Sequence, residues 1–257
     1  MDEKVLLEAV VLAGEIMLVS GAEVYRVENT MKYMLGRSSC ETAEAVVLAT
    51  GIFVTLDDPH QELLTMAKRI PARSTNVNRV CRVNDISRRF CRGEISVETA
   101  YQELREVEKE VLYTPFMKAL GFIGVSASFT FIFGGKPLDL LACTLVGICL
   151  ALADFLVKKI RLNDFCNNAF CSVVVAVCAM AIEKYILKNA SADVMIMSAI
   201  MTLVPGVTFT TAIRDTLNGD YAAGSARMLE AIVVALAVAA GVGSGMMFFR
   251  ALQGGVL

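Results

Sequence analysis

The sequence predicts a membrane all-α helical bundle of about five transmembrane helices, preceded by a small α+β cytoplasmic domain. The chain of 257 residues is 56% hydrophobic and 19% charged, with a mean hydropathy of +0.59, which is too apolar for a water-soluble domain. The charges are also uneven: residues 1–115 carry 32 of the 50 charged side chains, and residues 116–257 carry 18. We therefore expect a cytoplasmic domain over residues 1–115 and a transmembrane domain over residues 116–257.

The sequence of the N-terminal part predicts a small α+β domain. Residues 5–19 form an apolar stretch too short to cross a bilayer, so they predict a helix packed inside the soluble domain. Ser20-Gly21 predicts the end of this helix, and residues 22–36 predict a second one with Glu23 in its first turn. The remaining expected elements are a strand over 45–56, an extended segment over 63–70, a basic helix over 83–91 and a helix capped by Ser96.

Five apolar segments follow Pro115, each near the ~20 residues that span a bilayer core. They are residues 116–134, 138–157, 165–182, 194–213 and 231–249. Short loops after the second and fourth segments carry a dense basic cluster: Lys158, Lys159, Arg161, Arg214 and Arg227. The positive-inside rule then places these loops and the N-terminal domain of this multi-pass protein in the cytoplasm.

The fourth segment carries Pro205-Gly206 near its middle. Proline lacks the N–H donor and glycine tolerates non-helical geometry, so the helix is expected to break there. Broken helices in transporters bind anionic solutes through the free N–H groups of the second half-helix. The candidate solute-binding residues at this break are Pro205, Gly206, Thr208, Thr210, Thr211 and Arg214. A simple proline kink, with threonines bonded to their own helix, explains the same pattern equally well.

Other polar side chains enter the apolar segments near their ends. Asp154 and Glu230 are the candidates for proton coupling, although Asp154 lies four residues before Lys158 and a structural ion pair is the favoured interpretation. Asn167 and Asn168 begin the third segment, where they either cap the helix or face the solute path.

Several functional classes find no support. The eight cysteines form no Cys-x-x-Cys pair and His60 is the only histidine, so we expect no metal site, no cofactor and no enzyme activity. The net charge of −2 argues against nucleic-acid binding. A basic stretch over residues 66–92 is interpreted as a solvated face, with contact to anionic lipid or a phosphate as the alternative.

Four strings in this order resemble the threonine/serine exporter family of bacterial secondary transporters, in its short, split form. They are AGEIMLVSGAEVYRVENTM at 13–31, NDFCNNAF at 163–170, LVPGVTFTTAIRD at 203–215 and NGDYAAGSARMLEA at 218–231. The first string adds four matching positions: Glu23, Tyr25, Arg26 and Glu28. Members of the family often have an asparagine after the threonine that follows Pro-Gly, whereas this chain has Thr210-Thr211, which leaves the solute open.

The resemblance implies a proton-driven exporter in the bacterial inner membrane. Its solute would be small and carboxylate-bearing, either threonine and serine or a dicarboxylate such as succinate. It also implies a second, smaller membrane protein as partner, because the long form of the family has about ten spans on one chain. Membrane lipid would surround the spans, and a homo-oligomer is a further option. The alternative is a membrane-anchored scaffold or regulatory protein without transport activity.

Overall fold

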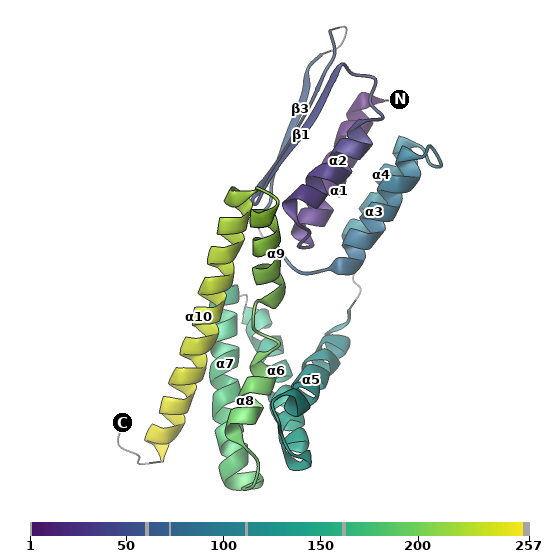
Figure 1. Ribbon diagram of the computed structural model, residues 1–257. Coiled ribbons are helices and arrows are strands. Elements are labelled where there is room, and N and C mark those ends of the chain that lie inside the picture. Colours follow the sequence, from purple (N-terminus) through teal and green to yellow (C-terminus); the bar gives the residue numbers. More distant parts are fainter. Residues whose placement is uncertain (1, 60–61, 72, 111–112, 161–162, 254–257) are drawn as a thin grey trace. The chain divides into compact units, whose positions relative to one another are not determined.

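The computed structural model describes residues 2–59, 62–71, 73–110, 113–160 and 163–253 and separates them into two compact units (Figure 1). The first unit comprises Met1–Glu110 and Gly206–Leu229, and the second comprises Val111–Pro205 and Glu230–Leu257. A segment late in the sequence therefore belongs with the N-terminal part. His60 and Arg161 lie outside the described residues.

Helices form most of the first unit, with α1 (Glu3–Val19) at its centre. This helix is apolar on most of its surface because it contacts α2 (Val24–Leu35), α3 (Val77–Cys91), α4 (Val97–Lys109) and the sheet. The prediction of a short buried helix over 5–19 is confirmed. The hydroxyl of Ser96 accepts a hydrogen bond from the Thr99 amide at 3.2 Å, so its role as the cap of α4 is also confirmed.

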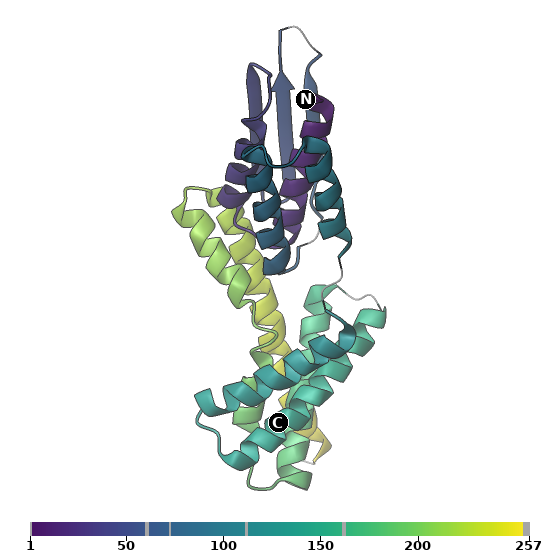
Figure 2. The same ribbon diagram turned by 90° about the vertical axis from the view of Figure 1, so that its right-hand side faces the viewer.

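An antiparallel sheet completes the N-terminal part, with its three strands in sequence order: β1 (Thr42–Leu48), β2 (Gly51–Asp57) and β3 (Leu64–Arg69) (Figure 2). The prediction of one strand over 45–56 is wrong, because a tight turn between Leu48 and Gly51 folds this run into a hairpin. Val46 and Phe53 pair on the solvent face of the hairpin and stay exposed. Because these exposed side chains are apolar, the sequence showed one continuous apolar run and gave no indication of the turn.

The late segment of the first unit is a helical hairpin of α9 (Gly206–Leu217) and the start of α10 (Tyr221–Leu252). Gly219 makes the turn with φ +89°, a conformation that side chains with a Cβ rarely adopt. A Cβ on Gly224 would lie 2.2 Å from Thr216 Oγ1, so this glycine permits the close approach of the two helices. Ala223 is buried in the same hydrophobic core as α1 to α4.

Helices also build the second unit: α5 (Pro115–Ile132), α6 (Pro137–Ile160), α7 (Asp164–Ala181) with a π-helical turn (Ile182–Ile186), α8 (Ala192–Ile200) and the rest of α10. Within the described residues, four helical segments are long and apolar enough to cross a membrane. They are Pro115–Ile132, Pro137–Ile160, Phe165–Ile186 and Tyr221–Leu252.

The expected fourth span, over 194–213, is not a continuous helix. Helix α8 ends at Ile200 and α9 begins only at Gly206, so the predicted break beside Pro205-Gly206 is confirmed. The physical reason is that Pro205 cannot donate the hydrogen bond that would continue the helix. Neither α8 nor α9 alone reaches the length of a span, and a count of five spans is not confirmed.

Glycines bring α10 against α7 within the second unit. A Cβ on Gly241 would lie 2.4 Å from the Ala169 carbonyl oxygen, and one on Gly245 would lie 2.9 Å from the Val173 oxygen. Gly243 faces open space instead. The small residues therefore serve helix packing at every fourth position, as expected for close helix contacts in membranes.

Candidate functional site

The amino end of α2 is where three of the quoted strings meet. Gly21 turns the chain with φ +84°, and Glu23 is the N-cap residue of α2 but makes no side-chain cap. The cap comes from α9: Asp215 Oδ1 accepts a hydrogen bond from the Val24 amide at 3.0 Å. A carboxylate at this position satisfies a free N–H group and the positive end of the helix dipole.

The Asp215 carboxylate is itself held by α10. Its Oδ2 lies 3.1 Å from Arg227 Nε, and Arg227 Nη2 donates to the Ala22 carbonyl at 2.7 Å. The Asp215 side chain is fully buried and that of Arg227 is 4% exposed. Burial raises the pKa of Asp215, while the charge of Arg227 acts in the opposite direction.

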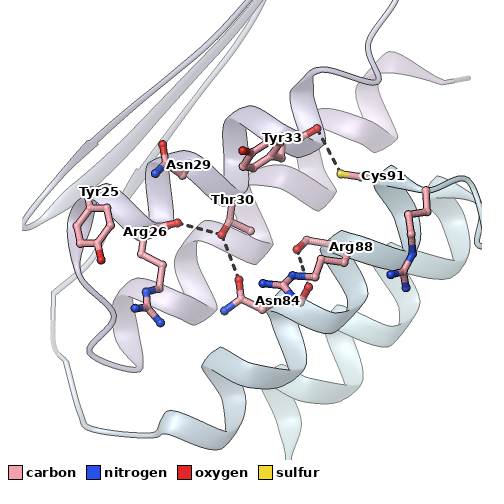
Figure 3. Close-up of a pocket in the computed structure, with 10 residues that line it drawn as sticks. Tyr25, Arg26, Asn29, Thr30, Tyr33, Asn84, Arg88 and Cys91 are labelled. Atoms are coloured by element: carbon pink, nitrogen blue, oxygen red, sulfur yellow. Dashed lines mark hydrogen bonds between the residues drawn. The ribbon is translucent and has the colours of Figure 1, made fainter.

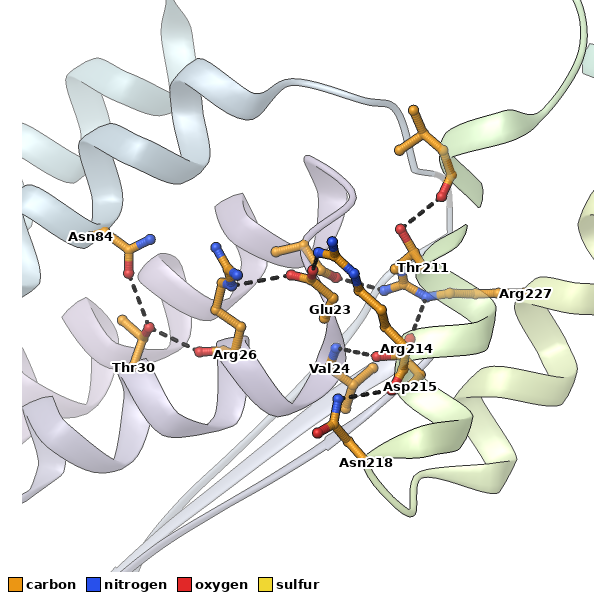
Figure 4. Close-up of polar contacts among 12 residues, drawn as sticks. Glu23, Val24, Arg26, Thr30, Asn84, Thr211, Arg214, Asp215, Asn218 and Arg227 are labelled. Atoms are coloured by element: carbon orange, nitrogen blue, oxygen red, sulfur yellow. Dashed lines mark hydrogen bonds and ion pairs between the residues drawn. The ribbon is translucent and has the colours of Figure 1, made fainter. Parts of the chain in front are cut away.

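Glu23 carries a second set of charged contacts at the same helix end. Its carboxylate lies 3.1 Å from Arg26 Nε and accepts a hydrogen bond from Arg214 Nη1 at 2.8 Å. Burial acts to raise the pKa of Glu23, but the hydrogen bond from Arg214 and the charges of both arginines lower it overall. We call the five residues Glu23, Arg26, Arg214, Asp215 and Arg227 the charge cluster (Figure 4).

The first turn of α9 holds the threonines predicted at the helix break. Thr210 and Thr211 donate their hydroxyls to the Val207 carbonyl, at 3.0 and 2.8 Å. The Thr208 hydroxyl makes no hydrogen bond within the described residues, and Gly206 borders open space. Local back-bonding thus accounts for two of the three hydroxyls, while Thr208 remains available to a ligand.

A separate polar group lies in the second unit. Asp154 accepts from Lys158 Nζ at 2.6 Å, which confirms the ion pair expected from their spacing, and it also accepts from Asn167 Nδ2 at 3.4 Å. The cap of α7 is Asn163, whose side chain accepts from the Cys166 amide. Asn167 therefore does not cap the helix but extends the Asp154 pair. Among the described residues, the side-chain amide of Asn168 has no hydrogen-bond partner.

Comparison with known proteins gives the family. The model of the ThrE family of threonine/serine exporters matches residues 8–249, nearly the whole chain. The chain belongs to the threonine/serine exporter family. It is a membrane protein of a transporter family, as the resemblance implied, and the described residues form no group of three or more His, Cys, Asp or Glu side chains that could hold a metal.

Curated relatives are distant and longer. The chain is 20% identical over 245 residues to a protein named "Probable threonine/serine exporter" from Mycobacterium tuberculosis, covering 92% of this chain and 45% of the relative. It is 25% and 24% identical to pheromone-regulated membrane protein 10 of Eremothecium gossypii and of Kluyveromyces lactis, over 69% and 65% of this chain and 24% and 18% of theirs. The chain thus spans less than half the length of these relatives. No solved structure matches.

Within this chain, the structure brings together some of the residues expected from the sequence. Glu23, Arg26 and Arg214 lie in the charge cluster, but Asp215 and Arg227 were missed as its buried members. The sequence marked Asp215 and Arg227 only by their place inside the strings that carry the family resemblance. A charged residue type does not show whether its side chain is buried.

The other expected positions lie elsewhere. Glu28 forms an ion pair with Lys32 on the surface of α2, and Tyr25 lines a pocket between α2 and α3. Glu230 is exposed on α10. Asn167 and Asn168 belong to the second unit, and whether they share one solute site with the first turn of α9 stays a prediction.

Proposed function

We propose that this chain is a subunit of a secondary exporter that moves small carboxylate-bearing metabolites out of a bacterial cell. The solute is threonine or serine, or a dicarboxylate such as succinate. The observation that carries the proposal is the helix restart at Gly206, where a first helical turn begins beside open space and an unbonded Thr208 hydroxyl. Membership of the exporter family supports the reaction class.

The start of α9 is suited to a carboxylate. The first N–H groups of a helix have no partner inside the helix and carry the positive end of its dipole. A solute carboxylate at Gly206 would accept hydrogen bonds from these N–H groups, and the Thr208 hydroxyl would donate a further hydrogen bond to it. Arg214 lies two turns further along α9, where its exposed side chain pairs with Glu23 and keeps donors free for a second group. Pro205, Thr210 and Thr211 complete this part of the proposed site by shaping the turn.

Proton coupling is assigned to carboxylates near the membrane segments. Asp154 is the stronger candidate, because it is 7% exposed and its contacts to Lys158 and Asn167 would change when it takes up a proton. Glu230 on α10 is the second candidate. Asn167, which bonds Asp154, and the neighbouring Asn168 are proposed as further solute contacts of the second unit.

A partner membrane protein is part of the proposal. The matched exporter of M. tuberculosis is more than twice as long as the segment it shares with this chain. Secondary transporters are commonly built from two related halves, and a second, smaller membrane protein would supply the missing one here. The N-terminal domain would face the cytoplasm, where basic residues such as Lys158 and Lys159 anchor the membrane segments.

Efflux from cells tests the proposal against the alternative of a scaffold without transport. Cells lacking their own exporters are loaded with a threonine or serine dipeptide, or with a succinate precursor, and release of the free solute is followed. We expect fast release only when this chain and its partner are expressed together. Equal release from cells with and without the chain would favour the scaffold.

A further inference from the structure

A pocket of about 430 Å³ lies within the first unit, between α2 and α3 (Figure 3). Its volume is in the range of small-molecule sites. Three arginines line it, Arg26 from α2 and Arg88 and Arg92 from α3 and its C-cap, while none of its described lining residues is Asp or Glu. The pocket is therefore a positively charged surface hollow in a chain whose net charge is −2.

The arginines differ in how far their charge is already compensated. Arg26 pairs with Glu23, and Arg92 Nε lies 2.6 Å from Glu94. Arg88 has no carboxylate within ion-pair distance among the described residues, and its side chain is exposed. An exposed arginine in a hollow, without an acidic partner, attracts an oxyanion that fits its planar fork of donors.

Neutral side chains in the pocket add directed donors. The Thr30 hydroxyl lies 2.9 Å from the Arg26 carbonyl oxygen and 3.4 Å from Asn84 Oδ1, as Figure 3 shows. Asn84 also lines the pocket, and its Nδ2 group makes no hydrogen bond among the described residues, so its donors are available to a ligand. Burial raises the pKa of the Cys91 thiol, which lowers the fraction of reactive thiolate. The side chains of the pocket therefore favour the binding of an anion.

We propose that this pocket binds a small soluble metabolite through its phosphate or carboxylate group, with Arg88 and Asn84 as the principal contacts. The site is distinct from the helix restart of α9 and does not depend on the transported solute. It gives a role to the basic stretch of residues 66–92, which the exporter function leaves unused.

Arg26 connects this pocket to the charge cluster. Its Nε lies 3.1 Å from one oxygen of Glu23, and the other oxygen lies 2.8 Å from Arg214 on α9. An anion in the pocket competes with Glu23 for Arg26. If the Glu23–Arg26 ion pair is lost, Arg214 remains as the partner of Glu23. Occupancy of the pocket and the charge state of the cluster are therefore coupled, and the coupling acts in both directions.

Tryptophan fluorescence tests the site directly, because the chain contains no tryptophan. The substitution Tyr33→Trp, at an exposed lining residue, gives the full-length protein in detergent a single reporter in the pocket. Inorganic phosphate, pyrophosphate and succinate are titrated at constant ionic strength, with sodium chloride as the reference. We expect a saturable change with at least one of the three anions. Absence of saturation with all three would overturn the proposal.

Two further variants are made in the Tyr33→Trp background. Arg88→Gln should weaken anion binding roughly tenfold or more, the effect of one lost hydrogen bond to a charged group. The matched control is Arg105→Gln, which removes an exposed arginine of α4 that bonds Tyr101 and does not line this pocket. Equal affinity in the Arg88 variant and the control contradicts the site.

The same fluorescence titration tests the coupling between the pocket and the charge cluster, and the source of the anion. Glu23→Gln frees Arg26 and should tighten anion binding several-fold, so an unchanged affinity would refute the coupling. Vesicles of phosphatidylglycerol and of phosphatidylcholine replace the soluble anions in a last series. A response to phosphatidylglycerol without a response to soluble anions would assign the pocket to a lipid headgroup and overturn the proposal of a soluble ligand.

Discussion

Asp215 and Arg227 form an ion pair across the α9–α10 hairpin, with Oδ2 3.1 Å from Nε and with side chains that are 0% and 4% exposed. Each residue also bonds the backbone at the start of α2, Asp215 to the Val24 amide and Arg227 to the Ala22 carbonyl. One buried pair thus joins segments that lie about 200 positions apart in the sequence. It attaches the helix that follows the break to the N-terminal helices.

The first prediction concerns the stability of this pair. Asp215→Asn leaves the buried Arg227 cation without its counter-charge, and loss of one partner of a buried pair typically costs about 3–5 kcal/mol. The matched control is Asp85→Asn, which removes an exposed carboxylate from its pair with Arg89 and should cost less than about 1 kcal/mol. Chemical unfolding of both variants in detergent measures the difference. Equal unfolding midpoints would show that the buried pair does not hold the hairpin.

The second prediction concerns pH. The folded-state pKa of Glu23 is lowered from 4.5, so its ion pairs contribute stability above about pH 4.5 and lose that contribution as the pH falls through the lowered value. Glu23→Gln removes this contribution. The difference in unfolding temperature between the parent and the variant should therefore be largest near neutral pH and shrink below pH 4.5. A difference in unfolding temperature that grows in acid would contradict the assignment.

The third prediction compares two glycines on α10. Gly241→Ala places a methyl group 2.4 Å from the Ala169 carbonyl oxygen, which belongs to the backbone of α7 and cannot move cheaply. Gly243→Ala meets open space and should be neutral, or stabilising by up to about 1 kcal/mol, because alanine favours the helix. The membrane abundance and the unfolding temperature should fall for Gly241→Ala and not for Gly243→Ala. A similar loss in both would mean that α7 and α10 do not pack through Gly241.

The fourth prediction concerns orientation in the membrane. Asn163 and Asn189 are exposed residues at opposite ends of the membrane segment Phe165–Ile186. In a cysteine-free background, Asn163→Cys should be protected from an impermeant thiol reagent in intact cells, whereas Asn189→Cys should be labelled, because we expect the basic loop after Lys158 and Lys159 to face the cytoplasm. The reverse labelling pattern would invert the topology.

Local features of the fold could be predicted from the sequence. The cap at Ser96, the helix break beside Pro205 and the Asp154–Lys158 pair all depend on residues within a few positions of one another. The strand hairpin at Leu48–Gly51 could not be predicted, because Val46 and Phe53 are apolar although they are exposed, so the sequence of the two strands has the pattern of one apolar strand.

The charge cluster needed the tertiary structure. Its contacts join Glu23 to Arg214 and Arg227 to Ala22, across separations of 191 and 205 positions. Sequence periodicity assigned α9 to a membrane span, and nothing in the local pattern indicated that α9 packs in the first unit. Arg214 was a candidate solute-binding residue, and in the structure it pairs with Glu23 of the same chain.

Solute release through the helix restart is the central claim, and one efflux measurement tests it. Thr208→Val and Thr210→Val are compared at matched membrane abundance, with the partner protein present. Thr208 has the unbonded hydroxyl, so its loss should slow efflux about five- to tenfold, as expected for one hydrogen bond of about 1 kcal/mol or slightly more. Thr210 already bonds the Val207 carbonyl, and its substitution should leave efflux nearly unchanged. Near-normal efflux in the Thr208 variant, and also in Pro205→Ala, would contradict a solute site at the start of α9.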